Sequence, residues 1–330
     1  MSTAVRTDLP GGVVRRGWHS LTDLLAGWLR PLAWINLAVE IGIVGTGGLV
    51  RLSGSGLGCP TWPQCVNGSI IPVAHQEQSW HKFVEFGNRT LTSVVGVVAV
   101  LLILAILGHR RAGNRQALLL PAFGVLAGIA LQAIVGGISV LTDLNPFIVA
   151  VHFLISMVLV ATSAWVVWQI RTHRLVQVRR ELRWLGTGTA TIAAIVLILG
   201  TAVTGAGPHS GDAAHPARFS FSPQSAAWLH ADMVMLFSGL VVAMLVATSM
   251  AGARSAMRVW RLVAIVTVLQ GIIGYTQYFL GVPGALVLIH MLMACLLVVV
   301  VTWGVLSLYP RTLPSVATTD AVRAATPVHH

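Results

Sequence analysis

Eight apolar runs, each long enough to cross a lipid bilayer, dominate this 330-residue chain. A helix needs about 20 mostly apolar residues to span a bilayer. With 55% hydrophobic and 9% charged residues, the composition is far from that of a soluble globular domain. The sequence therefore predicts an all-α integral membrane protein with eight transmembrane helices. The predicted spans are 31–51, 84–107, 117–141, 146–170, 185–206, 226–250, 259–281 and 284–308.

The positive charges are distributed unevenly between the two sides of these spans. Of the 21 Lys and Arg residues, 17 fall in the terminal tails and the even-numbered loops, which leaves four on the opposite side. This asymmetry follows the positive-inside rule and argues against a nucleic-acid partner for the net charge of +11. It predicts a multi-pass protein of the cell membrane with both termini cytoplasmic. The expected cytoplasmic segments are the tails 1–30 and 309–330 and a linker, 171–184, that faces membrane lipid.

A hairpin sequence occurs twice, 138 residues apart. Leu131-Gln132 leads into the helix that carries His152, and Leu269-Gln270 leads into the helix that carries His290. The repeat predicts two pseudo-symmetric four-helix bundles, an N-terminal half 31–170 and a C-terminal half 185–308, related by an axis along the membrane normal.

Four positions are candidates for a functional site: Asn88, His152, His230 and His290. Each is predicted a turn or two inside the outer end of an even-numbered span. Histidine is costly inside a membrane, and the competing explanation for one alone is a helix–helix hydrogen bond. His230 and His290 share a depth and could face each other as axial ligands of a haem iron, whereas zinc requires more ligands than this pattern offers.

The first half is less symmetric, because Asn88 stands where a histidine would pair with His152. Glu85 lies three residues before Asn88 on the same helical face. It could ligate, orient or shuttle a proton, or it could pair at the interface with Lys82 or Arg89. His81 is a spare ligand candidate at the edge of this site.

The first outside loop contains Cys59 and Cys65, which we expect to form a disulfide because thiols outside the cytoplasmic membrane tend to be oxidised. The bridge could shape a lid over the site or take part in redox exchange. Arg51, at the same level, could pair with a haem propionate. Cys295 indicates core packing, and Glu40 could hydrogen-bond within its bundle.

These residues together resemble the haem A synthase family. The similarity lies in the loop sequence 47–65, in 85–89, in 204–209 and in the repeated Leu-Gln…His hairpins, and it covers nearly all of 30–308. The resemblance implies an oxidoreductase that converts the C8 methyl of haem O to a formyl group, giving haem A for cytochrome oxidase. The implied partners, besides the substrate, are haem O synthase and cytochrome oxidase assembly factors.

The resemblance also implies roles for individual residues. His230 and His290 would ligate a haem b, His152 would help to bind the substrate haem, and Glu85 would be a catalytic or ligand carboxylate. Cys59 and Cys65 would form a lid disulfide.

The chain departs from the family at Asn88, where many members have histidine. In the first half, His152 alone, Glu85 or His81 could therefore serve as ligand. The alternative function is a di-haem electron-transfer cytochrome, which would favour haems at both membrane depths rather than at one.

Overall fold

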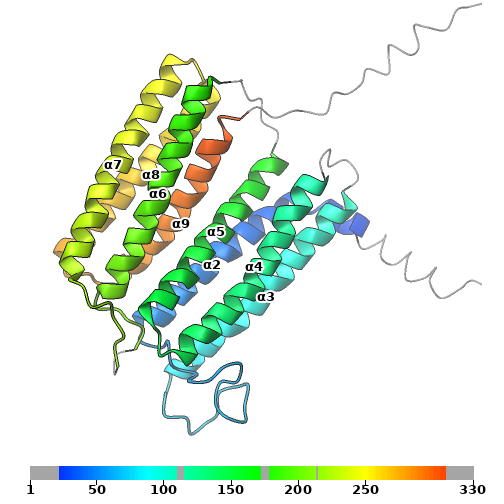
Figure 1. Ribbon diagram of the computed structural model, residues 1–330. Helices are drawn as coiled ribbons and strands as arrows, with labels where there is room; N and C mark the ends of the chain where they lie inside the picture. Colours follow the sequence, from blue (N-terminus) through cyan, green and yellow to red (C-terminus); the bar gives the residue numbers. More distant parts are fainter. Residues whose placement is uncertain (1–21, 110–114, 172–177, 213–214, 310–330) are drawn as a thin grey trace, which may run out of the picture.

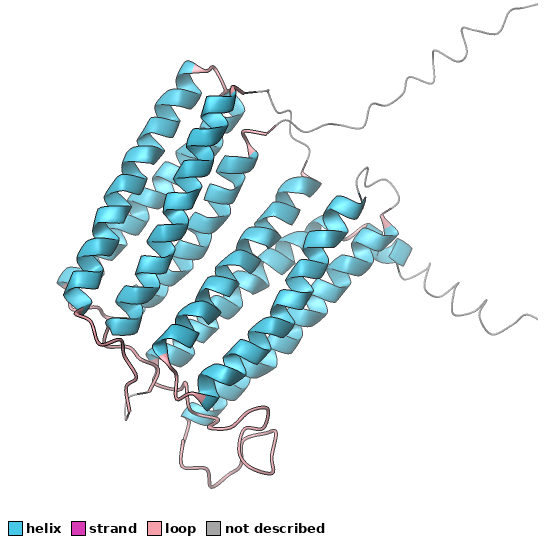
Figure 2. Cartoon of the chain, in the orientation of Figure 1, coloured by secondary structure: helices cyan, strands magenta, loops and turns pink. Residues whose placement is uncertain are grey.

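The computed structural model describes residues 22–109, 115–171, 178–212 and 215–309. This part of the chain contains eight helices that are long and apolar enough to cross a membrane, which confirms the predicted all-α class. Its only β-type pairing is one isolated bridge between Val66 and Ser69, and Figure 2 draws helices and loops but no strand. The helices are α2 (Leu29–Leu52), α3 (His81–Gly108), α4 (Arg115–Leu141), α5 (Pro146–Ile170), α6 (Arg180–Ala206), α7 (Pro223–Met250), α8 (Arg254–Phe279) and α9 (Gly284–Leu306).

Several helices extend beyond the predicted apolar runs. Helix α6 begins at Arg180 rather than at 185, and α8 begins at Arg254 rather than at 259. An apolar run marks only the hydrocarbon part of a span, whereas the helix continues through the polar interface. The second part of the expected linker, 171–184, is therefore the first turn of α6, and its residues 172–177 lie outside the described part.

Only small pieces of the expected tails fall within the described residues. Residues 22–26 form a short helix just before α2. Residues 1–21 and 310–330 lie outside the described part, so the predictions for them remain predictions.

The helices lie side by side with their axes roughly aligned (Figure 1). Helices adjacent in sequence pack as antiparallel pairs: α2 with α3, α4 with α5, α6 with α7, and α8 with α9. The group α2–α5 contacts the group α6–α9 mainly at three helix pairs: α2 with α9, α5 with α9, and α5 with α6. This arrangement is compatible with two four-helix halves meeting at their first and last helices.

Two ends of the molecule can be distinguished by their residues. Helices α3, α5, α7 and α9 begin at one end, which we call the histidine end because it carries the candidate histidines. The loop 53–80 hangs below this end in Figure 1. The opposite end, where α2, α4, α6 and α8 begin, carries nine of the thirteen Lys and Arg residues of the described part, and we call it the arginine end.

Apolar packing closes the interior, and many large apolar side chains remain on the outward faces, as a lipid-facing surface requires. Cys295 is fully buried in the cluster that joins α9 to α2 and α5, in line with its expected packing role. Asn36 and Ser163 link α2 to α5 by a 2.9 Å hydrogen bond. Glu40 is 2% exposed, and its Oε1 has no hydrogen-bond partner in the part of the chain that the structure describes.

Candidate functional site

The four candidate positions share one depth at the histidine end. Asn88 and His230 are the eighth residues of α3 and α7, and His152 and His290 are the seventh residues of α5 and α9. All four helices begin at the same end of the molecule (Figure 1). The structure thus gives these side chains the common level that the sequence predicted.

Each candidate histidine lies against a glycine of the preceding helix. A Cβ atom placed on Gly136 would lie 3.3 Å from Cε1 of His152, and one on Gly200 would lie 3.3 Å from Cε1 of His230. The corresponding distance from Gly274 to His290 is 3.2 Å. A real side chain at these glycines would push each imidazole aside, so the glycines leave space for rings held close to the neighbouring helix.

The Leu-Gln pair of the repeated hairpin acts on the same histidines. The amide Nε2 of Gln132 donates to the backbone carbonyl of His152 at 3.0 Å, and Nε2 of Gln270 donates to that of His290 at 3.0 Å. In both halves the histidine Nδ1 and the glutamine Oε1 are buried without a hydrogen-bond partner in the described part. Gln132 also contacts Ser156 of α5, which the second half does not reproduce.

His230 has a fixed ring orientation. Its Nδ1 lies 3.1 Å from the carbonyl oxygen of Val196 in α6, which requires Nδ1 to carry the proton and donate. Nε2 is then the nitrogen with a free lone pair, the arrangement usual for a metal-ligating histidine.

The fourth position is built differently. Asn88 accepts a hydrogen bond at Oδ1 from Oγ1 of Thr46 in α2, at 2.7 Å. This hydrogen bond holds Asn88 against α2.

The donor set fits a haem better than a metal cluster. Within the described residues, no group of three or more His, Cys, Asp and Glu side chains could hold a metal ion. A haem iron takes its four equatorial bonds from the macrocycle and needs only axial ligands from the protein. Three imidazoles at one depth, each beside a glycine, and two of them with an Nδ1 atom that has no hydrogen-bond partner in the described part, fit that requirement.

The outer loop is closed by the predicted disulfide between Cys59 and Cys65, and both cysteines are fully buried. Glu85 anchors this loop to α3: its Oε2 accepts a 2.6 Å hydrogen bond from the backbone N–H of Cys59. Oε1 accepts from Nη2 of Arg89 at 2.5 Å and from its Nε at 3.0 Å. Both carboxylate oxygens of Glu85 are therefore engaged in holding the loop.

Arg89 completes the anchor. Its Nη2 donates to the carbonyl of Cys59 at 2.8 Å, and its Nη1 donates to the carbonyls of Thr61 and Gln64 at 3.0 and 3.2 Å. The Glu85–Arg89 ion pair is thus hydrogen-bonded to the backbone near both ends of the disulfide-closed turn, at Cys59 and at Gln64. Lys82 takes no part in it and donates instead to backbone carbonyls of the outer loop.

The loop reaches the first-half site through Trp62. A Cβ on Gly137 of α4 would lie 2.4 Å from the Trp62 ring, so the indole packs directly on that glycine. Gly137 follows Gly136, the glycine beside His152, so the loop covers the helix next to that histidine. His81 makes other contacts: its Nδ1 shares a 2.8 Å hydrogen bond with Ser55, and its ring stacks on Trp80.

Arg51 joins the two groups of helices. Its Nε donates to the carbonyl of His209 at 2.6 Å, and its Nη2 donates to the carbonyl of Thr204 at 2.9 Å. Both acceptors lie at or just beyond the C-terminal turn of α6, where a cation is favourable. Pairing of Arg51 with a propionate remains a prediction. In the structure, Arg51 connects the end of α2 to the end of α6 by hydrogen bonds.

Sequence reasoning missed the glycines and the function of the glutamines. The signal was present, since a glycine stands sixteen residues before the histidine in both copies of the hairpin. Spacing alone could not show which face of each helix the glycine occupies.

Comparisons with known proteins agree with this geometry. The model of the family COX15-CtaA, described as "Cytochrome oxidase assembly protein", matches residues 30–302. Proteins named "Heme A synthase" from Lysinibacillus sphaericus and Ruegeria pomeroyi are 31% and 28% identical over 184 and 236 residues. These alignments cover 53% and 59% of this chain and 58% and 60% of the relatives. A third protein of that name, from Geobacillus kaustophilus, is 34% identical over 40% of each chain. The matches thus span roughly half the length of these relatives.

Proposed function

Since this chain belongs to the COX15-CtaA family of cytochrome oxidase assembly proteins, we propose that it is a haem A synthase. It converts the C8 methyl of haem O to a formyl group and releases haem A for cytochrome oxidase. The formal balance is –CH3 + H2O → –CHO + 4 H+ + 4 e–, and the four electrons pass to an acceptor outside this chain. The observation that carries the proposal is the repeated histidine–glycine–glutamine arrangement at one membrane depth, in a chain related to proteins of that name.

The second half holds a resident haem b. His230 and His290 would hold this haem: the hydrogen bond from Nδ1 to Val196 leaves Nε2 of His230 free to ligate iron. Haem b supplies electron transfer when bound. The chain's own contribution is to fix the two imidazoles, and the amide of Gln270 holds the backbone at His290.

The first half takes haem O as its substrate. His152 would hold this haem, while the other candidate position of the first half is Asn88, which supplies no imidazole and is hydrogen-bonded to Thr46. A substrate has to leave after the reaction, and a single axial histidine holds it less firmly than two would. The unequal halves therefore suit one exchanging haem and one resident haem.

The disulfide loop is the lid of the substrate site. It is anchored by Glu85 and Arg89 and places Trp62 on α4 beside the glycine that contacts His152. The catalytic role of Glu85 remains part of this proposal. Because both of its oxygens are engaged, it acts at least by positioning the loop.

The orientation follows from the charge distribution. The arginine end faces the cytoplasm, with both termini, and the histidine end faces outward. Haem O would come from haem O synthase within the cell membrane, and cytochrome oxidase assembly factors would receive the product.

Extraction of the bound haems tests the proposal. The full chain is purified in detergent from cells that also make haem O, and its non-covalent haems are separated and identified by mass. Haem A, or a C8-hydroxylated intermediate, is expected beside haem b. Haem b alone, with haem O available, would instead indicate an electron-transfer cytochrome.

A further inference from the structure

Two similar pockets lie at the arginine end, opposite the haem-binding histidines. The first has a volume of about 380 Å³ and lies between the start of α2 and the end of α5. The second, of about 290 Å³, lies between the start of α6 and the end of α9. Each pocket is thus formed by the first and the last helix of one half.

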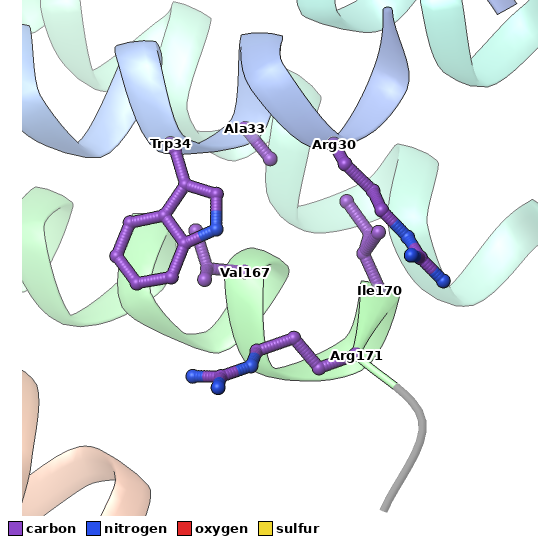
Figure 3. Close-up of a pocket in the computed structure, with 6 residues that line it drawn as sticks. All are labelled: Arg30, Ala33, Trp34, Val167, Ile170 and Arg171. Atoms are coloured by element: carbon purple, nitrogen blue, oxygen red, sulfur yellow. The ribbon is translucent and has the colours of Figure 1, made fainter. Parts of the chain in front are cut away.

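The first pocket combines two arginines with an indole. Arg30 and Trp34 project from successive turns of α2, and Arg171 lies just after the end of α5 (Figure 3). The Arg171 guanidinium lies 5.9 Å from the ring centre of Trp34 and 5.9 Å from that of Trp303. Ala33, Val167 and Ile170 form the apolar wall between the two arginines.

The second pocket reproduces this chemistry. Arg180 lies 5.8 Å from the ring centre of Trp184, and Arg183 lies 5.7 Å from that of Tyr309. The Nε atom of Arg183 is buried and has no hydrogen-bond partner among the described residues. A donor of this kind indicates that an acceptor belongs in the pocket.

The sequence carries the same duplication. Helices α2 and α6 both begin with Arg-x-Leu-x-Trp, at 30–34 and 180–184. Arg171 and Tyr309 are separated by 138 residues, the spacing of the histidine hairpins. The pockets therefore belong to the repeated unit, even though the arginine end has no part in the haem chemistry.

We propose that each pocket binds the phosphate diester headgroup of an anionic phospholipid. Guanidinium groups donate to phosphate oxygens in a planar fork. Among the described residues that line the two pockets, none is an Asp or a Glu. Indole rings favour the depth of the glycerol backbone at a membrane interface. Trp34 and Trp184 are both exposed, so each pocket has an apolar side chain on the outer surface against which an acyl chain would lie.

Native mass spectrometry of the full chain in detergent tests the proposal. The protein is titrated with phosphatidylglycerol and, separately, with zwitterionic phosphatidylcholine. We expect two tight phosphatidylglycerol adducts and no comparable phosphatidylcholine adducts. The double variant R30Q/R171Q should lose one adduct and R180Q/R183Q the other, each with an affinity loss of about tenfold or more, since each arginine near an anionic surface contributes about a factor of five.

The variant R254Q/R258Q is the matched control. It removes two arginines from the same end, at the start of α8, where they line neither pocket. It should keep both adducts. The lysine variant R30K/R171K, which keeps the charge without the planar fork, should bind more weakly than the wild type and more tightly than R30Q/R171Q. Each variant is checked for its haem spectrum and a single peak in gel filtration.

Three outcomes would overturn the proposal. Equal binding of the two lipids would remove the headgroup selectivity. An equal loss in R254Q/R258Q would reduce the effect to general surface charge. Displacement of the lipid by an equal excess of sn-glycerol 3-phosphate would assign the pockets to a free phosphate compound instead.

Discussion

At the scale of single residues, the site depends on small side chains as much as on histidines. Imidazole rings fit between α4 and α5, α6 and α7, and α8 and α9 because glycine stands opposite each ring. A membrane core is packed closely, so an added methyl group at such a contact has to displace a neighbour.

Gly274→Val should therefore disturb haem b binding. Its Cβ would lie 3.2 Å from Cε1 of His290, and the branched methyl groups would press on the ring further. We expect lower haem b content and an altered reduced-minus-oxidised spectrum. Gly271→Val, on the same helix with open space around its Cβ, is the control. Equal spectra for the two variants would contradict the assigned contact.

Gln270→Leu tests the second repeated contact. It removes the 3.0 Å hydrogen bond to the His290 carbonyl while keeping a similar side-chain volume. Loss of a group that orients a metal ligand commonly costs roughly tenfold to a hundredfold in affinity. Haem b should be lost more readily on dilution into haem-free detergent. The partner variant Gln132→Leu should leave haem b in place and weaken haem O binding, and a reversed result would exchange the two sites.

At the scale of elements, apolar run length predicted every described span and its order. It could not predict the ends, because α6 and α8 continue for about one turn into arginine-rich interface sequence. The outer loop is likewise predictable only in part. The sequence predicted its disulfide, but its attachment to Glu85 and Arg89 depends on how 58–65 folds back onto α3. Of the two alternatives for Glu85, pairing with Arg89 is present.

Glu85→Gln should loosen this loop. The amide keeps one acceptor for the Cys59 N–H but loses the ion pair with Arg89. This ion pair is charge-assisted, and Glu85 is only 5% exposed. Reduction of the Cys59–Cys65 bridge by a soluble thiol should become several-fold faster, measured by maleimide labelling and mass. Glu77→Gln, in the exposed part of the same loop, should have no effect.

The same variant separates two roles of Glu85. Slower haem A formation with faster disulfide reduction indicates that Glu85 acts by positioning the lid. Slower formation with an unchanged reduction rate indicates direct participation in the chemistry. Unchanged values for both would remove Glu85 from the mechanism.

At the scale of the whole molecule, the repeated sequence predicted the common depth of the candidate residues but not the joint between the two groups of helices. The sequence suggests Arg51 as a partner of a haem propionate. In the structure, two of its N–H groups donate to the carbonyls of His209 and Thr204, at the end of α6. Backbone carbonyls at a helix end have no sequence signature, so this tie could not be foreseen.

Arg51→Gln should lower thermal stability. Hydrogen bonds from a charged donor contribute about 2 kcal/mol each, and two are lost. We expect a melting temperature several degrees lower in detergent. Arg218→Gln removes the same charge from an exposed side chain at the same end, with one 3.2 Å hydrogen bond to Pro208, and should change little. Loss of haem with unchanged melting would favour the propionate partner instead.

The Thr46–Asn88 pair constrains the order in which this protein could change. A histidine introduced at Asn88 would meet the Thr46 side chain where the other three rings meet bare backbone. Asn88→His alone should therefore fail to add an axial ligand, while Thr46→Gly followed by Asn88→His should create one. In evolution or in design, a change from a one-histidine to a two-histidine form therefore requires glycine at position 46 before histidine at position 88. A residue of α2 thus determines whether α3 can supply a second ligand.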